Sequence, residues 1–236
     1  MRIVGFSTGR VREKRGKRGP RRYLSGGWSN STLPVNVFVV EHPAGLCLFD
    51  TGEGADAAKP GYFPWWHPYF RLSRFELEEA DEAAQQLKAL GYEPNDVRWV
   101  VLSHLHTDHV GGVKDFLHAD VVVHAPEWHR ARGLAGRLRG YLPQHWPDEL
   151  VPRLVELDGP AVGPFPASHD LAGDGSLVLV PLPGHTPGHI GLLTPGSLLV
   201  GDFVHEAHEL PSALASWCER EGFAALATHD DRATDR

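Results

Sequence analysis

The chain has few cysteines and no long apolar run, and each absence excludes a class of protein. Cys47 and Cys218 lie far apart in the sequence and form no CxxC pair, which argues against a disulfide framework and against a thiolate zinc site; a single bridge between them stays open. The longest apolar stretches, 35–40 and 192–201, are too short or too interrupted by Pro and Gly to cross a bilayer. No membrane partner is therefore expected.

The amino terminus also lacks the features of a secretory signal. Residues 1–9 contain no apolar core followed by a small-residue cleavage site, so a cytoplasmic location is the default expectation. Of the 236 residues, 42% are hydrophobic and 22% are charged, which is typical of a folded globular protein. The length predicts a single domain over 1–236.

Positive charge is concentrated in one short segment. The net charge is −7, but residues 10–22 hold eight Lys and Arg against one acid, Glu13. Without interleaved aromatic residues, this run predicts a solvated loop, and nucleic acid is not expected as a partner. The alternative is an anion-attracting rim beside a pocket.

Short apolar runs alternate with helical patterns along the chain, which predicts an α/β (α+β) fold. Leu and Ala recur at helical spacing over 76–90, and Gly91 is a typical helix stop. Further helices are expected at 126–138 and 211–220. The expected strands are 35–40, 46–50, 99–103, 121–124, 177–180 and 198–200.

The segment 60–75 is unusually rich in aromatic residues. These rings can line a substrate pocket, or fill core or subunit-interface space, and the sequence leaves both uses open. A homodimer is compatible with the second use. The candidate pocket residues are Tyr62, Phe63, Trp65, Trp66, Tyr69 and Phe70.

Several potential metal ligands follow the expected strand at 99–103. His104 and His106 point to the same side of an extended segment, so their imidazoles can converge on one ion. Asp108 and His109 then start a turn and can reach a second ion. Burying three imidazoles and a carboxylate at a strand end is costly without a cation. Ligand type and spacing therefore predict a metal site.

Further motifs follow in a characteristic order. The segment 184–189 reads GHTPGH, Asp202 comes directly after an expected strand, and His229 stands in THD near the end of the chain. The order HxHxDH, GH, D and H resembles that of the metallo-β-lactamase superfamily, as does Asp50 in the turn DTG. The resemblance implies a four-layer αββα sandwich that holds two divalent metal ions, Zn²⁺ first, with Fe, Mn or Co as alternatives.

The resemblance also implies a role for individual residues. The first metal would be bound by His104, His106 and His185. The second would be bound by Asp108, His109 and His229. Asp202 would bridge the two ions, and Asp50 would hold ligand imidazoles in the correct tautomer. His189 is interpreted as structural, and the spacing assigns no role to other histidines such as His67.

Within the superfamily, the chain is most similar to N-acyl-homoserine lactone lactonases. The similarity lies in SHLHTDHVGG at 103–112, GYEPND at 91–96 and PGHTPGH at 183–189. It implies a quorum-quenching hydrolase in which a metal-bridging hydroxide attacks the carbonyl of a small ester or lactone. A phosphodiesterase, which the basic segment favours, or a thioester hydrolase of the same superfamily is the alternative.

Asp108 and His205 are the predicted catalytic residues. His205 stands where those lactonases carry a tyrosine that donates a hydrogen bond to the substrate carbonyl, and an imidazole can donate in the same way. The alternative is a surface histidine on the loop after Asp202.

Overall fold

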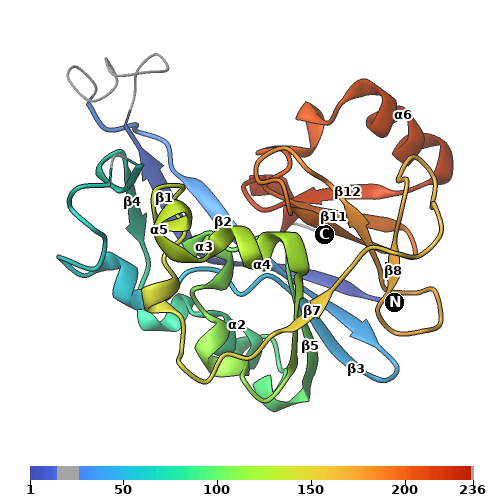
Figure 1. The fold of residues 1–236 in the computed structure, drawn as a ribbon, viewed down its shortest axis with the longest axis horizontal. Coiled ribbons are helices and arrows are strands. Elements are labelled where there is room, and N and C mark those ends of the chain that lie inside the picture. Colours follow the sequence, from blue (N-terminus) through green and yellow to red (C-terminus); the bar gives the residue numbers. More distant parts are fainter. Residues whose placement is uncertain (15–26, 68, 235–236) are drawn as a thin grey trace.

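The computed structural model describes residues 1–14, 27–67 and 69–234 as two mixed β-sheets packed face to face, with helices on their outer sides (Figure 1). Within these residues, the larger sheet has the strand order β4-β1-β2-β3-β5-β6-β7. Its strands are β1 (Ile3–Glu13), β2 (Leu33–His42), β3 (Gly45–Phe49), β4 (Ser73–Glu76), β5 (Val97–Leu102), β6 (Asp120–His124) and β7 (Arg153–Val155). Strands β3, β5, β6 and β7 run parallel, whereas β4, β1, β2 and β3 pair antiparallel.

The smaller sheet has the order β12-β11-β10-β9-β8, in which only β11 and β12 are parallel. Its strands are β8 (His169–Asp170), β9 (Val178–Pro181), β10 (Ile190–Thr194), β11 (Ser197–Gly201) and β12 (Ala224–Ala227). The α-helices are α2 (Ala83–Ala89), α3 (Thr107–Val110), α4 (Ala125–Ala131), α5 (Gly133–Arg137) and α6 (Ser212–Glu221).

The alternation of side chains along the strands separates the layers. On β2, Phe38 and Val40 face the second sheet, whereas Val37 and Val39 face the helices. The inner cluster joins residues of both sheets, such as Val101 of β5 and the β10 and β9 leucines. Because successive side chains of a strand point to opposite faces, apolar residues at every position indicate a sheet covered on both sides.

The outer layers are formed by helices on each sheet. Leu87 of α2 packs in the cluster behind the larger sheet, and Leu214 and Cys218 of α6 pack in the cluster behind the smaller one. The result is the predicted αββα arrangement. None of the described helices is both long and apolar enough to span a membrane.

All six predicted strands are present, with ends that differ from the predicted ones by no more than two residues. Strands β1, β4, β7, β8, β10 and β12 were not predicted. In β1 the cause is the sequence itself, which mixes Gly, Ser, Thr and Arg among the apolar residues of a half-buried strand. Hydrogen bonding to β2 and β4, rather than its own hydrophobic pattern, holds β1 in the sheet.

Two predicted helices are wrong in extent. The helix expected at 76–90 is only α2, because Glu76 pairs with Arg10 as the last residue of β4 and a separate 3-10 turn, η3 (Glu79–Asp81), follows it. The helix expected at 126–138 is two helices, α4 and α5. Gly133 has φ +73, a left-handed conformation that breaks helical geometry.

The two cysteines do not form a disulfide bond. Cys47 is buried between the sheets and Cys218 on α6, and both are free thiols, so the bridge that the sequence left open is not formed.

Of the basic segment 10–22, residues 15–22 lie outside the described residues. Arg10 pairs with Asp231 at 2.9 Å, and Arg12 pairs with Glu76.

Candidate metal centre

The motif residues lie where strands end. Asp50 follows β3, His104 comes two residues after β5, Asp202 follows β11, and His229 comes two residues after β12. Because β3 and β5 are parallel, as are β11 and β12, the carboxyl ends within each pair lie at the same edge. The two edges meet, and the polar side chains converge there.

The converging side chains form two groups in which the potential ligand atoms all lie within 4.8 Å of one another. The first group is His104, His106 and His185. The second group is Asp108, His109, Asp202 and His229. These are the seven residues that the resemblance assigns as ligands. The five histidines and Asp108 divide as the resemblance divides them, and Asp202, which it assigns as a bridge, falls in the second group.

Three imidazole nitrogens face one another in the first group. His104 Nε2 lies 3.0 Å from His106 Nδ1, which lies 2.9 Å from His185 Nε2. His106 Nε2 can donate to the Arg139 carbonyl at 3.3 Å, which leaves the Nδ1 lone pair facing the group. Burial lowers the pKa of His104 well below its usual value and that of His106 to about 4. Both rings are therefore neutral, as metal binding requires.

The second group is held together by Asp202. Its Oδ1 lies 3.2 Å from His109 Nε2 and 3.4 Å from His229 Nε2. Burial alone would lower the pKa of both histidines, but the Asp202 charge, together with that of Asp108, outweighs it. With the further contribution of Asp50 to His109 and of the Pro34 carbonyl to His229, the pKa of His229 is raised to about 9 and that of His109 well above 6.5. Burial would raise the pKa of Asp202, and His229 and then His109 hold it well below its usual value.

The donor set fits a pair of divalent cations. His109 Nε2 and Asp202 Oδ1 are buried and lie 3.2 Å apart, and neither has a hydrogen-bond partner among the described residues. Asp202 Oδ2 also lies 3.8 Å from His185 Nε2, so this carboxylate stands between the two groups. Converging imidazole nitrogens and carboxylate oxygens with unsatisfied buried atoms are what a zinc-like ion requires.

Asp50 fixes the orientation of the His109 ring. One carboxylate oxygen accepts the Ser103 backbone N–H at 2.7 Å, and the other accepts the Ser103 hydroxyl and His109 Nδ1–H, both at 2.8 Å. His109 Nε2 is thereby left free for a cation. Asp50 has φ +63, a left-handed conformation that Asp tolerates better than most residues. His229 Nδ1–H donates in the same manner to the Pro34 carbonyl at 2.6 Å.

A cavity of about 230 Å³ opens onto both groups. The metal-site residues that line it are His106, Asp108, His185 and Asp202. The rest of its wall is His67, Phe70, Thr107, Leu138, Arg139 and Gly140. A substrate in this cavity would lie directly against the ligand groups.

The candidate pocket residues of the aromatic segment are placed differently from one another. Phe70 lines the cavity. Tyr62 and Phe63 are partly buried against a small cluster that includes Phe75, whereas Trp65 is 82% exposed and Trp66 is 44% exposed. The side chain of Tyr69 lies outside the described residues.

His67 lines the cavity and Glu53 lies near Asp108, and sequence reasoning assigned neither of them to the site. His67 is buried beside the cavity, and neither of its ring nitrogens has a hydrogen-bond partner among the described residues. Glu53 is fully buried, and burial, followed by the Asp108 charge, raises its pKa to about 8. Neither residue belongs to one of the ligand motifs. The position of Glu53 in DTGEG, three residues after Asp50, was the feature of the sequence that could have indicated its place near the centre.

His205 lies at the edge of the centre. Its side chain is exposed, and its ring centroid is 5.6 Å from that of His229. The His205 backbone N–H donates to Glu209 at 3.1 Å, which holds the loop after Asp202. His189 is buried beside His104, with ring centroids 5.1 Å apart, and belongs to neither ligand group.

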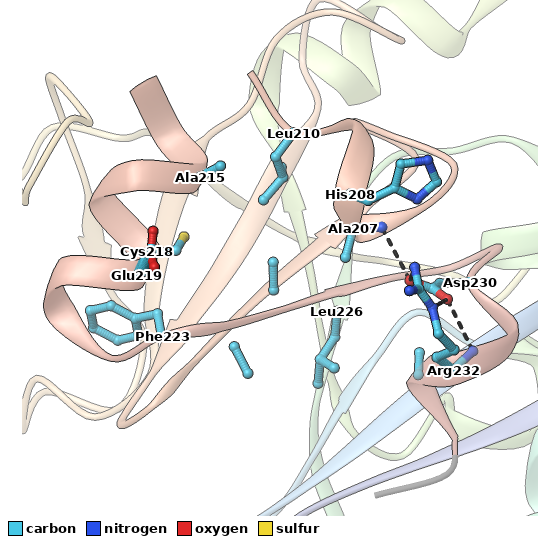
Figure 2. A pocket seen from close by; sticks show the side chains of 13 residues that line it. Ala207, His208, Leu210, Ala215, Cys218, Glu219, Phe223, Leu226, Asp230 and Arg232 are labelled. Carbon is cyan, nitrogen blue, oxygen red and sulfur yellow. Dashed lines mark hydrogen bonds and ion pairs between the residues drawn. The ribbon is translucent and has the colours of Figure 1, made fainter. Parts of the chain in front are cut away.

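A second hollow, of about 390 Å³, lies between α6, β12 and the neighbouring turns (Figure 2). Leu210 and Leu226 line it, and Asp230 lies at one end, where it accepts the Ala207 N–H and hydrogen bonds from Arg232 (Figure 2). No residue of either ligand group lines this hollow. The cavity at the metal centre is therefore the better candidate for chemistry.

The layers and the converging ligands define a metal-binding αββα protein. The sequence model of the metallo-β-lactamase superfamily matches residues 31–234, and the chain belongs to that superfamily. This result confirms the predicted fold class and the predicted resemblance.

Two relatives extend the comparison. A probable metallo-hydrolase of Mycobacterium tuberculosis (strain ATCC 25618 / H37Rv) is 40% identical over 167 residues, which are 66% of this chain and 51% of the relative. The chain thus spans about half of the length of this relative. N-acyl homoserine lactonase AttM of Agrobacterium fabrum is 32% identical over 207 residues, 81% of this chain and 74% of the relative.

Solved structures agree on the fold. A variant of B. thuringiensis AiiA with N-decanoyl-L-homoserine bound at its active site has a TM-score of 0.71 and 21% identity. The comparison covers 99% of this chain and 94% of the other. At this identity, the similarity establishes the shared fold.

Proposed function

We propose that the chain is a dinuclear zinc hydrolase that opens a lactone ring of the N-acyl-homoserine lactone type by attack of hydroxide on the lactone carbonyl. The observation that carries the proposal is the pair of ligand groups joined by Asp202 at the wall of one cavity. The lactonase AttM supports the choice of substrate, because the similarity covers most of both chains.

The residues of the chain have distinct parts in this reaction. When bound, two divalent cations supply Lewis acidity toward a carbonyl oxygen and lower the pKa of water. Asp202 sets the spacing of the two groups, and Asp50 keeps the His109 ring in its orientation. Asp108 lines the cavity, and we assign its carboxylate to carry the proton that the departing ring oxygen takes up.

The cavity favours a compact reacting group. At about 230 Å³ it is smaller than typical ligand pockets of roughly 300–1,000 Å³. Phe70 supplies an apolar surface for a lactone ring, and Leu138, which is 64% exposed, marks the side from which an acyl arm would leave. Such an arrangement encloses the ring and leaves the arm near solvent.

A substrate panel tests the proposal. Protein of measured metal content is assayed with N-hexanoyl-homoserine lactone, a thioester, a β-lactam and an activated phosphodiester. We expect the lactone to be hydrolysed fastest, with ring opening reported by product mass and by acid release at constant pH. If the phosphodiester turns over faster than every lactone tested, the alternative function is correct; the thioester arm tests the other alternative in the same way.

His205→Ala is expected to lower lactone turnover on the order of 10²-fold while both metals stay bound, as for loss of one oxyanion donor. The physical reason is that the His205 ring lies beside that of His229, a member of the second ligand group, and an imidazole in this position can donate a hydrogen bond to an oxyanion. The measurement is steady-state kinetics together with elemental analysis of the same sample.

His208→Ala is the matched control for this variant. His208 is an exposed histidine on the same loop, and its ring pairs with Glu206 at 3.1 Å instead of lying beside the ligand groups. Its replacement is expected to leave turnover unchanged. Equal turnover in His205→Ala and the wild type would make His205 a bystander, and loss of metal would make it a ligand; either result removes it from the oxyanion role.

A further inference from the structure

Glu127 is a buried carboxylate that lies beside the first ligand group without belonging to it. It is the third residue of α4 and is 1% exposed. Its Oε1 accepts the Leu105 backbone N–H at 3.2 Å, and Leu105 stands between His104 and His106. The bond therefore fixes the backbone between two ligands of the first group.

The other oxygen of the same carboxylate reaches a different part of the chain. Glu127 Oε2 accepts the Thr186 hydroxyl at 2.8 Å, and Thr186 directly follows His185. His106 and His185 are 79 residues apart in the sequence. One side chain thus joins the two segments that supply all three imidazoles of the first group.

The start of α4 is packed tightly enough against the GHTPGH segment to make this link rigid. A Cβ added at Gly188 would lie 2.4 Å from the Glu127 backbone nitrogen, a distance that no side chain tolerates. His124, the residue before α4, donates through Nδ1–H to the Gly188 carbonyl at 2.8 Å. The two backbones are therefore held in contact, and the carboxylate is directed between the loops.

Tyr141 extends the same arrangement toward His106. Its ring centroid lies 5.0 Å from that of His106, and its side chain is fully buried. Burial, and after it the Glu127 charge, raise the pKa of Tyr141, so the phenol stays protonated beside the carboxylate. Glu127 is thus surrounded by hydrogen-bond donors that all belong to, or contact, the loops of the first group.

We infer that Glu127 is a positioning residue that sets the separation of the His104–His106 and His185 loops and so determines the metal affinity of the first group. It acts through the backbone at Leu105 and the hydroxyl of Thr186, and not as a ligand. The inference concerns the ligand groups alone and does not depend on which substrate the enzyme takes.

The test is a Co²⁺ titration of metal-free protein, followed by visible absorption. His185→Ala and His229→Ala, which each lack a ligand of one group, assign the spectral bands to the first and second group. For Glu127→Ala we expect the dissociation constant of the first group to rise about 10- to 100-fold, as for other residues that orient metal ligands, and that of the second group to stay unchanged. Glu127→Gln should restore most of the affinity, because its amide can accept from Leu105 and donate to the Thr186 hydroxyl.

Glu82→Gln is the matched control. Glu82 is also a mostly buried carboxylate that joins two segments, since it accepts from the Ala55 N–H and from Lys114, both at 2.9 Å. It contacts neither loop of the first group, and its replacement should leave both Co²⁺ affinities unchanged. Thr186→Val removes one of the two hydrogen bonds to Glu127 and replaces Glu127→Ala in the test if that variant does not fold. It should lower the Co²⁺ affinity of the first group alone.

Unchanged affinity of the first group in Glu127→Ala, or in Thr186→Val where Glu127→Ala does not fold, would overturn the inference. An equal loss from both groups would overturn it as well, because it would indicate general destabilisation. Since the readout is metal binding, a failure of the lactonase proposal would leave this result standing, and the reverse also holds.

Discussion

An Asp202→Ala protein is expected to lose at least one of its two metal equivalents and nearly all of its turnover. Asp202 is 7% exposed and is the residue whose carboxylate approaches both ligand groups. Its removal deletes a shared ligand and also removes the largest of the carboxylate charges that act on His109 and His229. We expect turnover to fall well beyond the roughly 10²-fold that loss of one hydrogen-bond donor costs.

Elemental analysis of gently purified protein, combined with lactone kinetics, measures both effects. Asp230→Asn is the control, because Asp230 is equally buried and comes directly after His229, but accepts from Arg232 and Ala207 instead of facing the ligands. This control should retain two equivalents of metal. Full occupancy with normal turnover in Asp202→Ala would show that the carboxylate does not bridge the centre.

The ligand groups could be predicted from the sequence because their geometry is local or shared by a large superfamily. His104 and His106 alternate at a strand end, so their side chains point the same way without knowledge of the tertiary structure. Asp202 and His229 also follow strand ends, and their partners could be named only by resemblance. The structure then places all of these atoms within reach of one another.

Glu127 and His67 could not be found in this way, because what matters about them is which distant segment they contact. Glu127 lies in an ordinary helical stretch, APEWHRA, and its two partners come from loops before and after it in the sequence. His67 belongs to an aromatic segment whose rings divide between cavity, small core and solvent. Composition alone cannot distinguish these environments, because an aromatic ring suits each of them.

The long strand β1 was missed for a related reason. Its inward residues are few, and register is set by β2 and β4 on either side. A segment whose hydrophobic alternation is weak still forms a strand when a neighbouring strand on each side supplies hydrogen bonds. The same pairing takes Glu76 into the sheet and shortens the helix that the leucine spacing had predicted.

The metal-free protein is expected to become less stable as the pH rises from 6.5 to 9, both in itself and relative to the metal-loaded protein. In the metal-free protein, Asp202, Asp108 and the Pro34 carbonyl together outweigh burial and raise the pKa of His229 to about 9, against about 6.5 in an unfolded chain. The folded state then binds the additional proton, so this stabilisation is complete below pH 6.5 and is lost as the pH rises through 9. For His229 alone it amounts to about 3 kcal/mol, and His109 adds to it with the same sign.

Other buried groups change the stability in a different pH range, or change it equally in the metal-free and the metal-loaded protein. Burial lowers the pKa of His104 well below 6.5, that of His106 to about 4 and that of His189 to about 3. These three groups therefore make the folded protein more stable as the pH rises toward 6.5, and they have no further effect above that pH. Glu53, with a pKa raised to about 8, lowers stability between about pH 4.5 and 8. It is not a ligand, so the difference between metal-free and metal-loaded protein isolates the histidines.

Denaturant unfolding of chelator-treated and metal-loaded protein at pH 6.5, 7.5 and 8.5 provides the measurement. Metal binding requires both imidazoles to release their protons, so the loaded protein should become more stable relative to the metal-free protein at each step. Asp202→Asn, stripped of metal, removes the largest of the charges that raise both pKa values, so its stability should decline less between pH 6.5 and 8.5 than that of the metal-free wild type. A metal-free wild type that gains stability between pH 6.5 and 8.5 would show that His109 and His229 are neutral in the folded protein, and that the second group is arranged for a cation without holding protons in its place.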